Sequence, residues 1–92
     1  MLIARVVGTI VATRKHERLV GSKIQVVQPL DSKGEKPEGE QFVAIDAVGA
    51  GVRERVIVVR GSGARHGVDD ELSPVDAAII GIIDRIDIED DV

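Results

Sequence analysis

The sequence predicts an all-β fold in which a small sheet closes on itself, with one or two short helical turns. Val and Ile supply 26 of the 92 residues, and branched side chains favour strands over helices. Apolar runs of strand length are separated by polar segments that hold most of the glycine and proline. Gly8 lies within the first predicted strand, where it predicts the bend that a small closed sheet needs.

The first strand is predicted from about Leu2 to Thr13, because small or apolar residues alternate with others such as Arg5 and Thr9. This period of two places alternate side chains on opposite faces. We expect the even positions to face the core: Leu2, Ala4, Val6, Gly8, Ile10 and Ala12.

The second strand is predicted from Lys23 to Leu30, and Pro29 limits pairing near its end to an edge or a bulge. Its apolar residues share one face, as in the first strand: Ile24, Val26 and Leu30. Segment 31–40 is polar and rich in turn residues, so we expect an exposed and mobile loop there.

The third and fourth strands, predicted at Gln41–Ala47 and Val56–Arg60, are apolar on both faces. In the third, Phe42 and Ala44 share one face, and Val43 and Ile45 share the other. One small domain cannot cover both faces. The sequence therefore predicts that one of the two apolar faces is buried by a partner.

The last strand, predicted at Ala77–Ile83, is a continuous apolar run. An antiparallel sheet with one wet face does not account for such a run. At ~25 cal/mol per Å² of apolar area, a few buried Ile and Val side chains contribute several kcal/mol to a subunit contact, comparable to the stability of a small domain. We expect Ile79–Ile83 to serve both the barrel core and subunit contacts, with Ile80 and Ile82 as interface candidates.

Two short helical turns are predicted between the last two strands. Segment Ser62–His66 has room for about one turn. Segment Ser73–Asp76 has a Ser cap, a Pro at the first helical position and an acidic residue three positions after the cap. An alternative interpretation continues this second turn into a helix over Ala77–Asp84.

The segment Asp46–Val52 has the glycine spacing of a nucleotide-binding loop but lacks the helix that such a loop requires. Only four residues, 52–55, separate Gly51 from the β-branched run that starts at Val56. The segment is therefore predicted to be strand, glycine-rich turn, strand. Its glycines permit positive φ or close approach of another backbone, including that of a second copy of the chain.

Length and composition indicate a single domain over residues 1–92, with an acidic C-terminal tail from about residue 85. The chain contains no cysteine, so a disulfide framework and thiolate metal sites are excluded, and the cytoplasm is the default compartment. The N-terminal residues lack a signal peptide's pattern, and no apolar run reaches membrane-spanning length. We expect no membrane partner.

Nucleic acid is not expected as a main partner either. The formal net charge is −4 and Phe42 is the sole aromatic residue, so the chain cannot build the stacking platform that single-strand binders use. The basic cluster at residues 14–18 is interpreted as a solvated hairpin loop.

Catalytic and metal-binding interpretations are weak. Ser62 lies between Gly61 and Gly63, but a nucleophile elbow needs glycines two residues to either side, where this chain has Arg60 and Ala64. His16 and His66 have no metal-binding spacing. Three carboxylates stand at strand or turn boundaries, where aspartate usually accepts backbone hydrogen bonds: Asp46, Asp76 and Asp84. We predict no enzyme activity, no metal and no cofactor.

Five successive segments, in order along nearly the whole chain, resemble those of the EutN/CcmL family of bacterial microcompartment vertex proteins. They are VGTIVATRKH (7–16), VVQPLD (26–31), AIDAVGAGV (44–52), RGSGAR (60–65) and PVDAAIIGIID (74–84). The resemblance implies a small five-stranded barrel related to the oligonucleotide/oligosaccharide-binding (OB) fold. It also implies a homopentamer that caps the five-fold vertices of a protein shell tiled by hexameric shell proteins.

The resemblance also implies sites of contact. Gly49, Ala50 and Gly51 match the family's glycine turn and are expected near a subunit boundary or the ring axis. Ser62, Ala64 and Arg65 match the turn after the fourth strand and are the second group of interface candidates. Arg53 and Gly63 depart from the family's usual smaller or better helix-forming residues at their positions.

Two other hypotheses remain open from the residues themselves. One is a monomeric OB-like module that binds oligosaccharide or nucleic acid, which the shortage of aromatic residues disfavours. The other is a small enzyme that uses Asp46 or Ser62.

Overall fold

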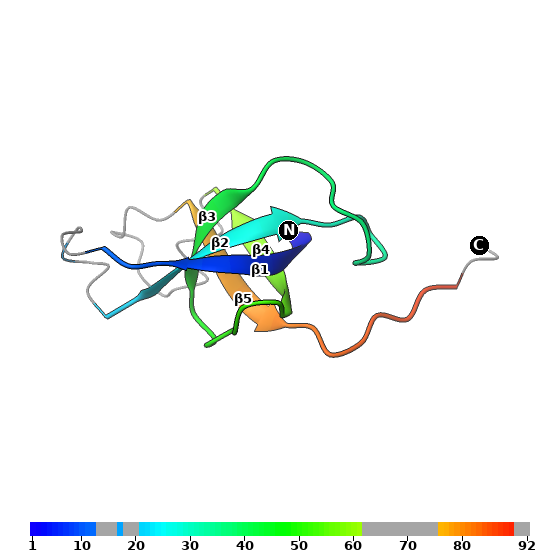
Figure 1. The fold of residues 1–92 in the computed structure, drawn as a ribbon. Coiled ribbons are helices and arrows are strands. Elements are labelled where there is room, and N and C mark those ends of the chain that lie inside the picture. The colour runs from blue at the N-terminus through cyan, green and yellow to red at the C-terminus, as the bar shows by residue number, and fades with distance from the viewer. Residues whose placement is uncertain (13–16, 18–20, 62–75, 90–92) are drawn as a thin grey trace.

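In the part of the chain that the structure describes, five strands form one sheet that closes into a barrel in the order β1-β2-β3-β5-β4 (Figure 1). The computed structural model describes residues 1–12, 17, 21–61 and 76–89. The strands are β1 Leu2–Ile10, β2 Lys23–Pro29, β3 Phe42–Asp46, β4 Arg55–Arg60 and β5 Ala77–Ile82. The expected five-stranded OB-like barrel is confirmed.

Four of the strand pairs are antiparallel, and the pair that closes the barrel is parallel. β1 pairs with both β2 and β4, and β4 pairs with β5. β3 then meets β5 through Ile45 opposite Ala78 and Asp46 opposite Ile79. The amide of Ala47 extends this contact by donating to the Ile79 carbonyl at 3.2 Å.

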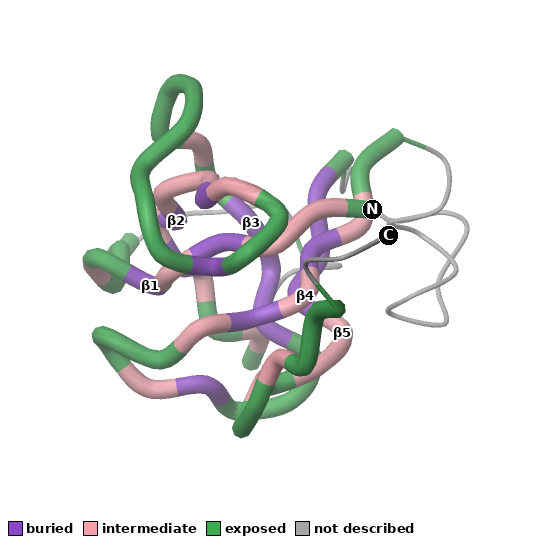
Figure 2. Tube along the Cα trace, turned by 90° about the vertical axis from the view of Figure 1, so that its right-hand side faces the viewer, coloured by how far each residue is buried: buried purple, intermediate pink, exposed green. Residues whose placement is uncertain are grey.

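The barrel interior is a small core of aliphatic side chains. Figure 2 shows buried positions recurring along the strands. Ile79 is the largest fully buried side chain, and Leu2 and Phe42 pack against the core from its edge. The buried members are Ala4, Val6, Val27, Ala44, Ala50, Val56, Val58, Ala77 and Ile79.

A β-bulge in β1 overturns part of the predicted facing. Val6 pairs with Val27 and Gly8 pairs with Val26, so Val7 is the extra residue. The bulge reverses the alternation, because one added residue exchanges the two faces. Val6 is buried as expected, but the prediction that Gly8, Ile10 and Ala12 face the core is wrong.

The facing of β2 also differs from the expectation, and Leu30, predicted to share the face of Ile24 and Val26, is buried. Ile24 and Val26 share a face, as predicted, but it is the outer face of the barrel. The fully buried positions are Gln25 and Val27. The predicted end of the first strand, Thr13, lies outside the described residues, and β1 ends at Ile10.

Loop 31–40 is mainly exposed, as predicted, and its first half is held by its own hydrogen bonds. Leu30 forms an isolated bridge with Pro37, and the Asp31 amide donates to the Lys36 carbonyl at 2.9 Å. The Glu35 amide donates to Asp31 Oδ1 at 3.0 Å. This bond is the main reason that the pKa of Asp31 lies below its ordinary value of 3.8.

The segment from residue 77 onward is a strand, so the alternative helix over Ala77–Asp84 is wrong. The predicted turns at Ser62–His66 and Ser73–Asp76 lie outside the described residues, except for Asp76 itself. After β5, the Ile83 amide donates to the Arg55 carbonyl at 2.9 Å. Residues 84–89 then continue beyond the end of β5 without forming a further strand (Figure 1).

Across the part of the chain that the structure describes, we find no helix long and apolar enough to cross a membrane.

Replacing Ile79 with alanine tests the assignment of the core. Ile79 is 0% exposed, so Ile79→Ala leaves a cavity and should lower the free energy of unfolding by about 2–5 kcal/mol. Urea denaturation followed by circular dichroism measures this loss. Ile88→Ala is the control, because Ile88 is 48% exposed in the tail. Equal losses in the two variants would contradict the assignment.

Candidate subunit interface

A row of apolar side chains runs across the outer surface of the barrel. Strand register places its members opposite one another on successive strands. Ile80 of β5 packs against the buried residues of this row, Ile45 and Ala78. The members of this outer row, from β1 through β2, β3 and β5 to β4, are Ile10, Ile24, Ile45, Ala78 and Val59.

The outer row is covered at its centre and open on one side. Ile45 and Ala78 are 8% and 0% exposed, whereas Ile10 is 38% exposed. Val43 lies on the same outer face, opposite Val26 on β2, and is 47% exposed. We call Ile10, Val26 and Val43 the outer patch. The predicted second apolar face of the sheet is therefore present, and part of it lies in solvent.

The turn after β3 is held by the side chain of Asp46. Asp46 Oδ1 accepts from the amides of Val48 and Gly49, both at 2.8 Å, and Oδ2 accepts from the amide of Ala50 at 2.7 Å. Asp46 therefore satisfies three backbone donors that belong to no strand ladder. The predicted strand, glycine-rich turn and strand are confirmed, as is the expected role of Asp46 as a backbone acceptor.

Gln25 joins this turn to the barrel wall from β2. Its Nε2 donates to the Ala50 carbonyl at 2.9 Å and to Asp46 Oδ2 at 3.3 Å. Its Oε1 accepts from the Thr9 hydroxyl at 2.6 Å. Lys23 Nζ also donates to the Ala50 carbonyl, at 3.0 Å. We call these five residues the Gln25–Asp46 network.

The three residues predicted from the glycine turn differ in their surroundings. Gly49 has a φ of 80°, and a Cβ added there meets no atom within 4 Å. Ala50 is fully buried by its own chain. The Gly51 amide donates to Glu54 Oε1 at 2.7 Å. The assignment of these residues to a subunit boundary or the ring axis remains a prediction.

The other predicted interface residues are partly described. Ile80 is the bulged residue of β5, because Ile57 pairs with Gly81 and Val58 pairs with Ile79. Ile82 is 36% exposed at the end of the strand. Their contact with a neighbour remains a prediction. Three candidates lie outside the described residues: Ser62, Ala64 and Arg65.

Arg53, noted above as a departure from the family, has a φ of 81°. Residues that carry a Cβ rarely adopt this left-handed backbone conformation. Its amide donates to the Val6 carbonyl at 2.7 Å, and its carbonyl accepts from Arg5 Nη1 at 2.7 Å. These bonds to β1, beside the bulge, hold the strained residue in place.

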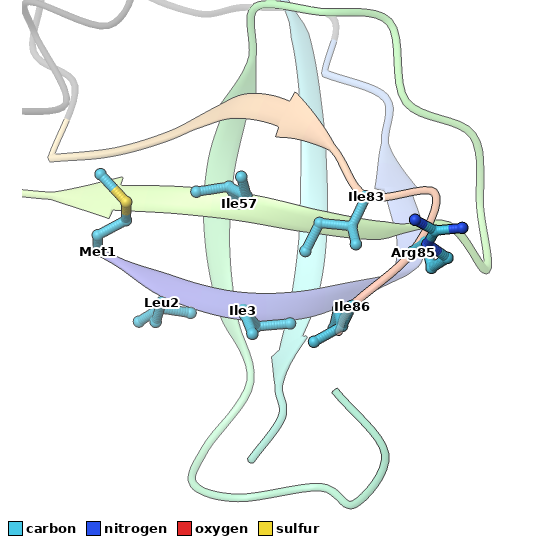
Figure 3. A pocket seen from close by; sticks show the side chains of 7 residues that line it. All are labelled: Met1, Leu2, Ile3, Ile57, Ile83, Arg85 and Ile86. Atoms are coloured by element: carbon cyan, nitrogen blue, oxygen red, sulfur yellow. The ribbon is translucent and has the colours of Figure 1, made fainter. Parts of the chain in front are cut away.

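An apolar hollow of about 400 Å³ lies where the tail passes β1 and β4 (Figure 3). Arg85 is the one charged residue of its described lining, and its Nε donates to Asp87 at 3.1 Å. The described lining of the hollow is mainly aliphatic and does not contain the pair of acidic and basic groups that general acid–base catalysis uses. Its lining is Met1, Leu2, Ile3, Ile57, Ile83, Arg85 and Ile86.

Ile86, the tail residue that lines this hollow, packs against Gly34 of loop 31–40. A Cβ added to Gly34 would lie 2.6 Å from Ile86 Cδ1 and 3.1 Å from Arg55 Nη1. Glycine at this position therefore lets the tail, the loop and β4 pack together. In the sequence, the residue appeared only as a turn glycine.

The predicted catalytic alternatives gain no support from the described residues. Asp46 is committed to the turn, and Asp76 and Asp84 are exposed. The described residues contain no group of three or more His, Asp or Glu side chains placed to hold a metal ion. His16, His66 and Ser62 lie outside them.

The closed barrel and its apolar outer patch define a small β-barrel subunit as the class of protein. The chain belongs to the EutN/CcmL family, because the family model described as "Ethanolamine utilisation protein EutN/carboxysome" matches residues 1–84.

Similar proteins extend this match over nearly the full length of the chain. The carboxysome shell vertex protein CcmL of Synechococcus elongatus is 52% identical over 89 residues, which cover 97% of this chain and 89% of that protein. The bacterial microcompartment shell vertex protein EutN of Salmonella typhimurium is 45% identical over 86 residues, which cover 94% and 86%. The GrpN pentameric microcompartment shell protein from Rhodospirillum rubrum has a TM-score of 0.85 at 42% identity, covering 97% of this chain and 100% of that chain.

Substitution of Gly34 tests the contact between tail and loop. Gly34→Ala introduces both a strained φ of 70° and a clash with Ile86, whereas Gly61→Ala introduces the strain alone, since its φ is 69° and no atom lies within 4 Å of the added Cβ. We expect Gly34→Ala to lower the midpoint of thermal unfolding more than Gly61→Ala. Amide exchange at residues 83–88 should also rise only in Gly34→Ala. Equal behaviour of the two variants would show that the clash has no effect.

Proposed function

We propose that this chain is a structural shell protein that forms homopentamers and caps the vertices of a bacterial microcompartment. The observation that carries the proposal is its match, over nearly the whole chain, to proteins named as shell vertex proteins. One solved relative is named as a pentameric shell protein. The outer patch gives a physical reason for assembly, because apolar area exposed on the subunit is removed from water in a ring.

A ring of identical subunits needs two different surfaces on each subunit, since the contact is head-to-tail. The barrel supplies one such surface through Ile10, Val26 and Val43. The glycine turn supplies a candidate for the other, through Gly49, Gly51 and the exposed Val52. A rotation that closes after five copies fits a vertex, because a flat hexagonal layer becomes a closed polyhedron only at five-fold positions.

The role is structural rather than enzymatic, and it requires neither a metal nor a cofactor. The partners in this role are four further copies of the chain and the hexameric shell proteins that tile the facets. Neither nucleic acid nor a membrane takes part. The site of action is the microcompartment shell within the cytoplasm.

The alternative of a monomeric binding module is disfavoured by the environment of Phe42. Its ring packs against the barrel core. The Arg60 guanidinium lies over the same ring, 4.3 Å from its centroid. The single aromatic side chain is therefore engaged within the subunit, and one ring does not build the platform on which successive bases or sugars stack.

Electron microscopy of the purified protein tests the proposal directly. Class averages of the wild type should show five-fold rings, and native mass spectrometry should give five times the subunit mass of 9.8 kDa. A protein that stays monomeric at high concentration would refute the proposal.

Placing a charge in the outer patch should break the ring. Val43→Lys leaves the isolated subunit folded, because Val43 is 47% exposed there, but it buries an unpaired ammonium in an apolar contact at a cost of several kcal/mol. Native mass spectrometry at micromolar concentration should then show mainly monomer. Ile80→Asp and Gly49→Arg are expected to act in the same direction.

The matched control is Ile88→Lys, which adds the same charge to an exposed isoleucine of the tail. This variant should retain the pentamer. If Val43→Lys still formed five-fold rings, the outer patch would not be part of the subunit interface, but the proposal of a pentamer would stand.

A further inference from the structure

Gln25 is the polar residue that the barrel buries most completely, at 0% exposure. Burying an amide costs free energy unless its groups are paired, and replacing a buried hydrogen-bonded pair by apolar groups of similar shape can be nearly neutral. Gln25 is fully used: its oxygen accepts from Thr9, and its nitrogen donates to Ala50 and Asp46. Both acceptors of the nitrogen lie at the glycine turn: Ala50 is part of the turn, and Asp46 binds the amides of the turn through its carboxylate.

The bonds of the Gln25–Asp46 network converge on a stretch of backbone that no strand ladder supports. Asp46 fixes the three consecutive amides of residues 48–50. Gln25 and Lys23 both donate to the carbonyl of Ala50, at the end of the same segment. Side chains of β2 and β3 therefore determine the conformation of the turn within a single subunit, before any neighbour is present.

The turn held in this way presents apolar groups to the outside. Val48 is 41% exposed and Val52 is 50% exposed, on either side of the glycines. Between them, the space beside Gly49 is open to at least 4 Å. An ordered apolar turn with room beside it is suited to contact with another backbone, and its prior order lowers the entropy that association must remove.

We propose that Gln25 is a positioning residue for assembly: together with Asp46 it holds turn 47–51 in the conformation that contacts a second copy of the chain. This inference rests on the proposed function. Assembly then selects a turn that is already formed, and loosening the turn weakens the ring without unfolding the barrel.

Gln25→Leu is the direct test. It keeps the volume of the buried side chain and leaves the groups of the turn paired, since the Ala50 carbonyl retains Lys23 and Asp46 Oδ2 retains the Ala50 amide. The Thr9 hydroxyl loses its bond to Gln25, but Thr9 is exposed, so water replaces the lost acceptor. We expect amide exchange at residues 48–50 to accelerate about tenfold, and the concentration for half-assembly to rise about tenfold, from the loss of one or two hydrogen bonds. The measurements are exchange mass spectrometry and sedimentation velocity on the full chain.

Val27→Ala is the matched control. Val27 is also fully buried on the inner face of β2, and its truncation lowers the thermal midpoint without removing a bond to the turn. Exchange at residues 48–50, relative to the strands, and the half-assembly concentration should stay at wild-type values. If Val27→Ala weakens assembly as much as Gln25→Leu does, general stability explains the effect and the inference is wrong.

Thr9→Val provides a second route if Gln25→Leu does not fold. It removes the hydroxyl that orients Gln25 Oε1 and should produce smaller shifts in the same direction. Unchanged exchange and assembly in the variant that folds would overturn the inference. If the wild type is monomeric, the proposed function fails, and the exchange rates alone decide whether Gln25 orders the turn.

Discussion

Closure of the sheet is the constraint on which the rest of this structure depends. It is completed by a short parallel contact, in which Ile45 and Asp46 of β3 meet Ala78 and Ile79 of β5. A closed sheet has no free edge, so the backbone groups of its strands pair internally. Closure also fixes which side chains are inside, and a five-stranded barrel has room for few of them.

The limited interior explains why the outside of this barrel is apolar. The core is filled mainly by Val and Ala, with Ile79 as its largest member. The remaining branched residues of the two-faced strands must stand on the outer surface, where some are covered and others, such as Val43, are not. The surface suited to assembly is thus a direct result of strands that are apolar on both faces and a core too small to hold them all.

Several polar groups of the barrel hold irregular backbone segments in place. Gln25 and Asp46 shape the glycine turn through side-chain bonds, and Arg53 is held in a left-handed conformation by bonds to β1. The turn is therefore an ordered extension of the barrel. Gly34 has a similar effect at the tail, where the missing side chain lets Ile86 and Arg55 approach the loop.

Local pattern alone predicted much of this protein. Strand positions, the absence of a helix directly after Gly51, the two apolar faces of β3 and the capping role of Asp46 all follow from residues close in sequence. Each depends on a short-range rule, such as the alternation of side chains or the preference of aspartate for backbone donors.

Only the tertiary structure decided which face of β1 and β2 looks inward. Alternation specifies that neighbours face opposite ways, but the direction of the core depends on the partner strand, and one bulged residue, Val7, reverses it. Gln25 was missed for this reason, since the expected facing placed it outside. Gly34 was read as a turn residue because Ile86, which it accommodates, is distant in the chain. The sequence determined the strands and their apolar faces, whereas long-range pairing determined what those faces meet.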